Sequence, residues 1–162
     1  MKPEELDFPA TDAHVHLYPD RLAGIVTPAL AERFGNGPAF DGTVAGCKAK
    51  DAVDGIAASI NLPVATKPDN LGGFGMWDEV EETLVGEPVY RDLAHTFFWA
   101  PDEVILRIIQ RHGAERIPFG TDAPWQDPGK VLDAFLSLPL DGRARRLICH
   151  DNAAGLLRIS MD

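Results

Sequence analysis

The stretch Thr11-Asp12-Ala13-His14-Val15-His16-Leu17 decides the fold, because it predicts the first strand and places two histidines at that strand's carboxyl end. Residues two apart on a strand project from the same face, roughly 6.6 Å apart along it, so His14 and His16 can converge on one cation. Asp12 could orient the strand end from behind the histidines. Imidazole pairs suit Zn²⁺ and other first-row metals. The stretch therefore predicts a metal-binding strand end.

A second motif, Gly120-Thr121-Asp122, follows the last predicted strand, residues 116–121. In parallel α/β folds the carboxyl ends of the strands form the active face. If the sheet closes or nearly closes, its first and last strands are neighbours, and Asp122 can then meet His14 and His16. The alternative is that the histidines are hydrogen-bonded core residues and that Asp122 caps a turn.

Short apolar runs alternate with segments of helical period, which is typical of βα units around a parallel sheet. Strands are predicted at residues 11–17, 55–61, 89–94 and 116–121, and the second of them reads as buried on both faces. Helices are predicted from about residue 27 to Gly35, at 43–53, at 76–85, from 101 to Gly113, from 127 onward and after residues 150–152. The pattern predicts a barrel-like α/β domain of about four to five parallel strands with surrounding helices.

The composition indicates one acidic globular domain. The chain has 162 residues, of which 45% are hydrophobic and 25% charged, enough for a single core, so residues 1–162 are expected to form one domain. Its 25 acidic and 15 basic residues give a net charge of -10, which repels nucleic acid and anionic membranes. The N-terminus lacks an apolar segment, and no run approaches the roughly 18 apolar residues of a membrane span. We expect a soluble, cytoplasmic protein.

The two cysteines, Cys47 and Cys149, have no CxxC spacing. They are interpreted as buried thiols of a reducing compartment, not as a disulfide framework.

Three motifs occur in order along the chain: TDAHVHLY at residues 11–18, FGTDAPW at 119–125 and DNAAGLL at 151–157. They resemble the first strand, the final strand and the closing helix of the amidohydrolase superfamily, specifically its amidohydrolase-2 branch of metal-dependent hydrolases and decarboxylases. The resemblance covers two blocks, 7–68 and 71–159. It implies a (β/α) barrel in which His14, His16 and Asp122 bind a divalent metal.

The resemblance also implies that the middle of the barrel is missing. The sequence Asn70-Leu71-Gly72-Gly73 is similar to the family's His-Leu-Gly-Gly, with Asn70 in place of the histidine. The stretch from Pro63 to Asn70 is far too short for a βα unit, which takes around 30 residues. The two blocks are thus expected to be joined across a deletion that removes the middle-strand histidines, and Asn70 is a possible additional site residue.

Other side chains could add to the site. His95 directly follows the third predicted strand and is a candidate substitute ligand, with a hydrogen-bonded structural role as the alternative. His112 and His150 lie near predicted helix ends, where capping or dipole contacts are expected. Three tryptophans could line a substrate pocket or simply pack in the core or rim: Trp77, Trp99 and Trp125, of which Trp125 lies three residues after Asp122.

The resemblance implies a metal-dependent hydrolase acting on an amide, ester or lactone bond of a small carbonyl compound, or a nonoxidative decarboxylase. The metal, Zn²⁺ or alternatively Mn²⁺ or another divalent ion, would lower the pKa of bound water, and Asp122 would accept its proton and return it to the leaving group. The alternative is a truncated, catalytically weak or inactive half-barrel that self-associates, for example as a homodimer. A third hypothesis is a nonmetal α/β binding module. The number of protein ligands separates the first two.

Overall fold

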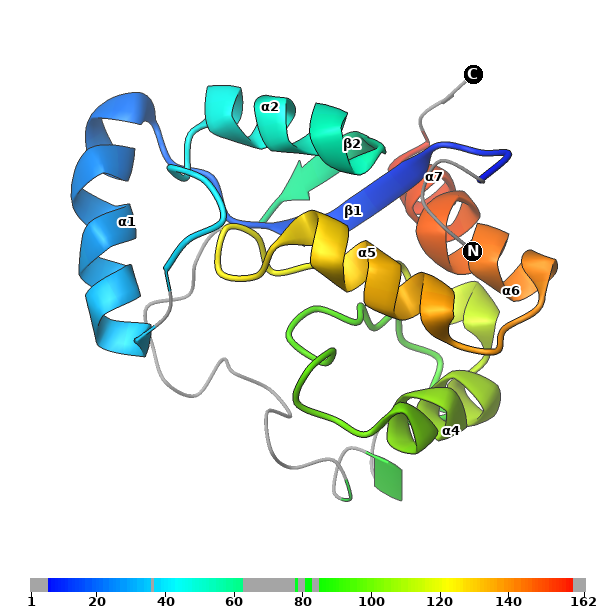
Figure 1. Cartoon of the computed structure of the whole chain (residues 1–162). Helices are drawn as coiled ribbons and strands as arrows, with labels where there is room; N and C mark the ends of the chain where they lie inside the picture. The colour runs from blue at the N-terminus through cyan, green and yellow to red at the C-terminus, as the bar shows by residue number, and fades with distance from the viewer. Residues whose placement is uncertain (1–5, 36, 63–77, 79–80, 83–84, 159–162) are drawn as a thin grey trace.

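Two parallel strands form the centre of the computed structural model, which describes residues 6–35, 37–62, 78, 81–82 and 85–158 (Figure 1). Strand β1 (Ala10–Val15) pairs in parallel with β2 (Ile56–Asn61). All residues of β1 except His14 are buried. The mixed α/β class with parallel strands is confirmed. β2, in contrast, is not buried on both faces as predicted, because Ala57 and Asn61 are exposed.

A tight helix–strand connection precedes β2. Helix α2 (Val44–Asp54) begins where the Thr43 hydroxyl accepts a hydrogen bond from the Gly46 N–H, and it ends at Gly55. The left-handed φ of 76° at Gly55 suits glycine, which has no Cβ to clash. The chain therefore reverses into β2 within one residue, close to the predicted boundaries.

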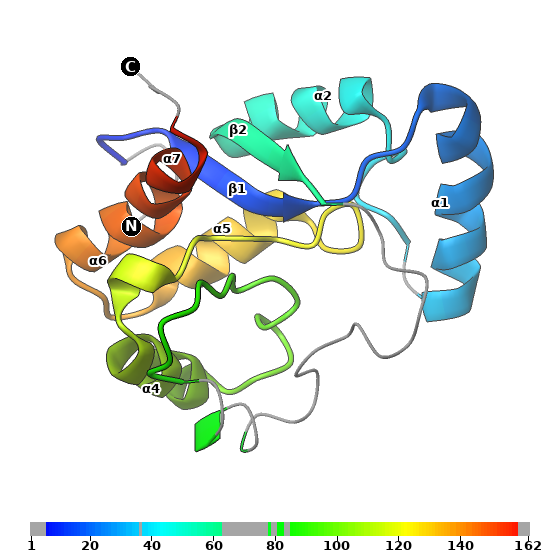
Figure 2. The same cartoon turned by 180° about the vertical axis from the view of Figure 1, so that it is seen from behind.

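The opposite side of β1 is lined by residues 117–123, which run beside it without forming a regular strand (Figures 1 and 2). Ala13 N–H donates to Phe119 O (2.7 Å), and His16 N–H donates to Ala123 O (2.6 Å). The predicted strand at 116–121 is wrong as a regular strand for two reasons. Pro118 has no N–H to donate, and the Thr121 N–H donates to a side chain, Asp12 Oδ1. The first and last segments are nevertheless neighbours, as predicted.

The predicted strand at residues 89–94 is also irregular. Its backbone makes one hydrogen bond next to the 117–123 segment, from Arg91 N–H to the carbonyl oxygen of Arg116 (3.1 Å). The Asp92 carboxylate then accepts from the Ala94 N–H (2.9 Å), which turns the chain away from the sheet direction. Within the described residues, two regular strands are thus present instead of four to five.

Helix α1 (Asp20–Phe34) starts earlier than predicted and contains Pro28 in its interior. The helix begins after Pro19, with Asp20 in the first turn, where a carboxylate is favourable. It ends at Gly35, as predicted, in a left-handed conformation. Figure 2 shows α1 beyond the carboxyl end of β1.

Helices α4 (Asp102–His112) and α5 (Pro128–Ser137) supply much of the core, as predicted. The Asp127 side chain caps α5 by accepting from the Lys130 N–H, and Pro128 follows at the first helical position. Buried side chains on the two helices include Ile105, Ile108, Ile109, Val131, Leu132, Phe135 and Leu136. Phe97 and Phe119 pack against Phe135 with ring centroids 6.3 and 5.7 Å away.

The C-terminal helical run begins earlier than predicted. It consists of α6 (Gly142–Arg146), the π-helical turn Leu147–Asp151 and α7 (Asn152–Leu157), and it starts where Asp141 accepts from the Ala144 N–H. Residues 150–152, after which the last helix is predicted to begin, therefore lie inside the run. Asn152 instead donates its side-chain amide to Ala114 O (2.7 Å) and Ile117 O (2.9 Å). This contact fixes the start of the 117–123 segment.

Asn70 and Trp77 lie outside the described residues, as does most of the predicted helix at 76–85. In the described parts of the chain, no helix is both long and apolar enough to cross a membrane.

Candidate metal centre

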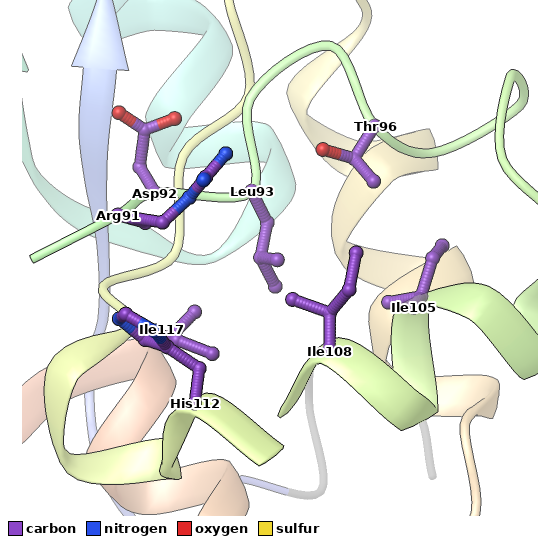
Figure 3. Close-up of a pocket in the computed structure, with 8 residues that line it drawn as sticks. All are labelled: Arg91, Asp92, Leu93, Thr96, Ile105, Ile108, His112 and Ile117. Atoms are coloured by element: carbon purple, nitrogen blue, oxygen red, sulfur yellow. The ribbon is translucent and has the colours of Figure 1, made fainter. Parts of the chain in front are cut away.

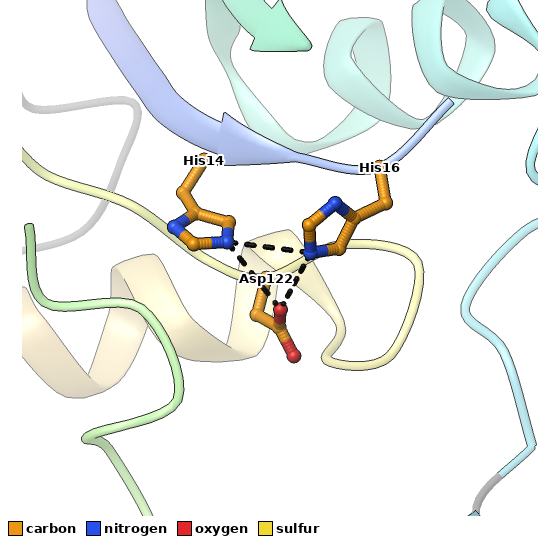
Figure 4. A group of neighbouring side chains, drawn as sticks. All are labelled: His14, His16 and Asp122. Atoms are coloured by element: carbon orange, nitrogen blue, oxygen red, sulfur yellow. Dashed lines mark hydrogen bonds and ion pairs between the residues drawn. The ribbon is translucent and has the colours of Figure 1, made fainter. Parts of the chain in front are cut away.

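The side chains of His14, His16 and Asp122 converge, and one potential ligand atom from each lies within 4.8 Å of the others (Figure 4). The two Nε2 atoms are 3.3 Å apart. Asp122 Oδ1 lies 3.1 Å from Nε2 of His16 and 3.6 Å from Nε2 of His14. The sequence predicts that these three residues meet, and they do, although 106 positions separate His16 from Asp122.

Each histidine is held from behind by its other ring nitrogen. His14 Nδ1 donates to Asp92 Oδ2 (3.0 Å), and His16 Nδ1 donates to the carbonyl oxygen of Leu62 (2.8 Å). Metal-ligating histidines commonly make this outer bond to a carboxylate or a backbone carbonyl, because it fixes the tautomer and the ring orientation. Where the ring is neutral, this bond leaves Nε2 with a lone pair directed at the cluster; where the ring is protonated, Nε2 donates instead.

With both rings neutral, three acceptors, two nitrogen lone pairs and a carboxylate oxygen, face one another. Acceptors at such distances repel unless a proton or a cation lies between them. Two imidazoles and a carboxylate are a ligand set that suits Zn²⁺ and related divalent ions. The residues present fit a metal.

The carboxylates around the cluster favour positive charge within it. Burial alone would lower the pKa of His14, but the hydrogen bond and charge of Asp92, with the charges of Asp122 and Asp12, raise it above the ordinary value. Burial alone would raise the pKa of Asp122, but hydrogen bonds and charge from His16 and His95 hold it below its ordinary value. Asp122 is therefore ionised at neutral pH.

Asp12 joins the two motifs from behind. Its side chain is fully buried and accepts from the N–H groups of His14 and Thr121, each at 3.0 Å, and from the Thr121 hydroxyl. Burial raises its pKa to about 7 against the opposing effect of these hydrogen bonds, with a further contribution from the charge of Asp51. The carboxylate thus connects the end of β1 to the segment that carries Asp122.

Local backbone conformation aims Asp122 at the histidines. Its φ is 67°, a left-handed conformation that aspartate adopts more readily than most residues. Two residues earlier, a Cβ on Gly120 would lie 2.8 Å from His14 Cβ and 3.2 Å from Asp92 Cβ. A residue without a side chain is therefore required where the two segments approach.

His95 contacts Asp122 from the other side. Its Nδ1 lies 3.1 Å from Asp122 Oδ2, the carboxylate oxygen that does not face the histidine pair. The ring stacks on Trp99, with centroids 5.7 Å apart and planes 16° from parallel. His95 is thus beside the centre, as predicted, but its Nδ1 faces Asp122 and not the three-atom cluster.

The remaining candidates are placed elsewhere. Trp125 is 9% exposed, and its backbone N–H donates to the backbone carbonyl of Asp122 (2.9 Å). His112 accepts from the Gly86 N–H at Nδ1 and donates to Val89 O from Nε2, so both ring nitrogens have partners. His150 Nδ1 lies 2.8 Å from Asp151 Oδ1. None of these contacts directs a ring nitrogen to the cluster.

A small cavity lies behind Asp92 (Figure 3). Its volume of about 20 Å³ has room for one water molecule, not for a substrate. It is lined by Arg91, Asp92, Leu93, Thr96, Ile105, Ile108, His112 and Ile117.

Sequence reasoning missed two groups, Asp92 and the Leu62 carbonyl, that hold the histidines. Asp92 lies in the predicted strand 89–94, near its carboxyl end, so the rule that selected Asp122 could have found it. A backbone carbonyl leaves no signal in residue type, so Leu62 could not have been found.

Several solved structures are similar to part of the chain. A 2,6-dihydroxybenzoate decarboxylase from Rhizobium is 23% identical, with a TM-score of 0.41, over 51% of this chain and 23% of that one. A dihydroxybenzoic acid decarboxylase from Polaromonas sp. JS666, with bound manganese and the inhibitor 2-nitroresorcinol, is 23% identical, with a TM-score of 0.41, over 59% of this chain and 26% of that one. A putative 2-pyrone-4,6-dicarboxylic acid hydrolase from Pseudomonas putida is 19% identical, with a TM-score of 0.43, over 67% of this chain and 45% of that one. This chain thus spans less than half the length of each.

No curated protein matches the chain significantly. The sequence model of the amidohydrolase family matches residues 71–159, more than half of the chain and including the Asp122 motif. The chain belongs to the amidohydrolase family.

Proposed function

We propose that the chain binds a divalent metal through His14, His16 and Asp122 and acts as a metal-dependent hydrolase on an amide, ester or lactone bond of a small carbonyl compound. Nonoxidative decarboxylation of a carboxylate substrate is the other chemistry of this proposal. The observation that carries it is the pair of Nε2 lone pairs, which Asp92 and the Leu62 carbonyl turn toward Asp122 Oδ1.

The number of ligands favours a catalytic role over a structural one. Structural zinc sites have four protein ligands, whereas catalytic sites keep three and leave a position for water or substrate. Three ligand atoms converge in the described part of the chain. Zn²⁺ is our first choice for this ligand set, and Mn²⁺ is the main alternative.

A divalent ion held there would polarise a substrate carbonyl and make water more acidic. The pKa of Asp122 lies below its ordinary value, so its carboxylate is ionised at neutral pH and can accept a proton during attack and return it to the leaving group. Asp92 and Leu62 keep the imidazoles of His14 and His16 oriented throughout.

Metal analysis of the purified protein tests this proposal. We expect stoichiometric divalent metal in the wild type and loss of it in His14→Ala and Asp122→Asn. Asp133→Asn, on an exposed position of α5, is the matched control and should keep the metal. Unchanged metal content in the two site variants would refute the proposal.

A second candidate is a truncated, catalytically weak or inactive half-barrel that self-associates. Among the described residues, β2 pairs only with β1, and Ala57 on it is exposed. Such a strand edge can pair with another chain. Sedimentation over a range of concentrations should then show a dimer, and a monomer at every concentration would exclude it.

We also infer that residues 1–162 form one domain in a reducing, cytoplasmic compartment. Cys47 and Cys149 are both free and buried, as expected for such a location. The net charge of -10 supports a small-molecule substrate over nucleic acid or an anionic membrane as partner. Limited proteolysis should release no stable subdomain, and cell fractionation would test the location.

A further inference from the structure

The loop that follows Asp92 has an unusual backbone next to the metal centre. His95 and Phe98 both have positive φ, 56° and 71°, although neither is glycine. Non-glycine residues keep such conformations only where their surroundings impose them, and these residues cluster at functional sites. The loop is anchored at its start by Asp92, which contacts both His14 and the Ala94 N–H.

The backbone conformation of His95 places its ring beside one oxygen atom of Asp122, Oδ2. Nδ1 lies 3.1 Å from Asp122 Oδ2, and because an ionised carboxylate can only accept, the imidazole donates this hydrogen bond. The side chain of His95 is 35% exposed and that of Asp122 is 15% exposed, so the contact lies at the mouth of the centre. Trp99 stacks on the same ring and limits its rotation.

The two oxygens of Asp122 therefore have different tasks. Oδ1 faces the Nε2 atoms of His14 and His16, while Oδ2 is engaged by His95. A carboxylate without this second partner can rotate about its Cβ–Cγ bond, and both of its oxygens then become available to a metal. Hydrogen bonds to ligating carboxylates are part of how a protein tunes a metal site.

We propose that His95 is a positioning residue, which holds Oδ2 of Asp122 so that Oδ1 alone is presented to a divalent ion. The inference rests on the proposed function, because it concerns the same metal centre. It replaces the expectation that His95 is itself a substitute ligand, since its Nδ1 is turned to the carboxylate.

The test compares Zn²⁺ affinity, measured by competition with a chelator, in the wild type, His95→Ala and His95→Asn. Asparagine places an amide nitrogen where Nδ1 stands and tolerates positive φ. Loss of such an outer partner costs about 10- to 100-fold in metal affinity, so we expect a weakening of that size in His95→Ala. His95→Asn should bind close to the wild type. If His95→Ala does not fold, His95→Gly removes the same donor and suits the backbone.

A second readout separates positioning from simple support of the loop. Cobalt(II) bound to the wild type should give the strong visible absorption of a low coordination number. In His95→Ala the freed carboxylate can bind through both oxygens, so the absorption of the fully loaded protein should weaken. Trp99→Leu keeps the donor and should show a smaller change in both measurements.

The outcomes are distinguishable. A wild type that binds no metal defeats the proposed function, and this inference with it. A wild type that binds metal, with the same affinity and cobalt spectrum in His95→Ala, overturns the inference alone. Equal losses in His95→Ala and His95→Asn also overturn it, because the donor at the Nδ1 position would then not be the group that matters.

Discussion

The two flanks of β1 are built in different ways. On one side, β2 pairs with β1 as a parallel strand, with two shifts of register along the pair, yet it is half-exposed. On the other side, residues 117–123 form no regular strand, yet alternate residues of the segment are almost completely buried: Ile117, Phe119, Thr121 and Ala123, none more than 1% exposed.

The difference explains how the Asp122 side chain is directed at the two histidines. On the irregular flank, side-chain hydrogen bonds replace part of the backbone ladder, and Asp12 makes most of them. A regular ladder would use the Thr121 N–H for backbone pairing. Its capture by Asp12 frees the chain to turn at Asp122 and aim the carboxylate at the histidines.

Asp12→Ala should break the irregular flank and have the largest effect. It leaves the N–H groups of His14 and Thr121 and the Thr121 hydroxyl without their buried acceptor. Each unsatisfied buried group costs about 1–3 kcal/mol, so we expect the free energy of unfolding to fall by about 3 kcal/mol or more. Urea denaturation measures this change, and metal content should fall with it.

Asp51→Ala is the matched change on the flank formed by β2. Asp51 is also buried and accepts from Cys47 Sγ and the Ser59 hydroxyl. Since fewer and weaker donors lose their partner, we expect a loss of about 1–2 kcal/mol. A loss equal to that of Asp12→Ala would contradict the contrast between the flanks.

Gly120→Ala should also act on the irregular flank. The new Cβ would lie 2.8 Å from His14 Cβ, which forces the two segments apart and should cost about 1–3 kcal/mol. Gly24→Ala, inside α1 with nothing within 4 Å of the added Cβ, should stabilise by about 0.5–1 kcal/mol. Thermal melts of both variants test this pair. Two shifts of the same sign would show that close approach at Gly120 is not what matters.

The rates at which the two cysteines react with a thiol reagent compare how readily the two flanks open. Cys47 lies beside β2, whereas Cys149 follows Ile148, whose carbonyl accepts from the Phe119 N–H of the irregular flank. Burial raises the pKa of Cys47 to about 12 and raises that of Cys149 further, so both thiols should react slowly at pH 8. If the half-exposed flank formed by β2 opens more readily than the flank formed by residues 117–123, Cys47 should label about tenfold faster than Cys149.

Single-thiol variants, Cys47→Ser and Cys149→Ser, allow the two rates to be measured with a chromogenic disulfide reagent. Faster labelling of Cys149 would mean that the buried flank is the less stable one.

The smallest effect is expected at the outer edge of β2. Ala57 is exposed, so Ala57→Thr should change the free energy of unfolding by less than about 0.5 kcal/mol. Metal content should not change. A loss of metal in this variant would show that the two flanks are coupled more tightly than the structure indicates.

The predictable parts of the fold are those with local signals. The start of α2 at Thr43 and the start of α5 at Asp127 are encoded by side chains that cap the helix three residues further on. The convergence of the three site residues followed from a general rule about strand ends. Each of these inferences needed only neighbouring residues or a property of the whole fold class.

What could not be predicted depends on contacts between distant residues. Asp12 accepts a hydrogen bond from the Thr121 N–H, 109 positions away. That N–H is then not available for backbone pairing, so residues 116–121 do not form the regular strand that their sequence favours. Asp92 binds His14 across 78 positions. The early start of the last helical run is an exception, since Asp141 is a capping residue that the sequence displays.

The contact between Asp12 and Thr121 also bears on how the protein is made. During synthesis from the N-terminus, both histidines emerge from the ribosome more than a hundred residues before Asp122. Contacts of such long sequence separation form late and slowly, because the intervening chain must first be ordered. A nascent chain therefore carries two imidazoles without their third partner while about a hundred further residues are made, and the three side chains can meet only after Asp122 has emerged.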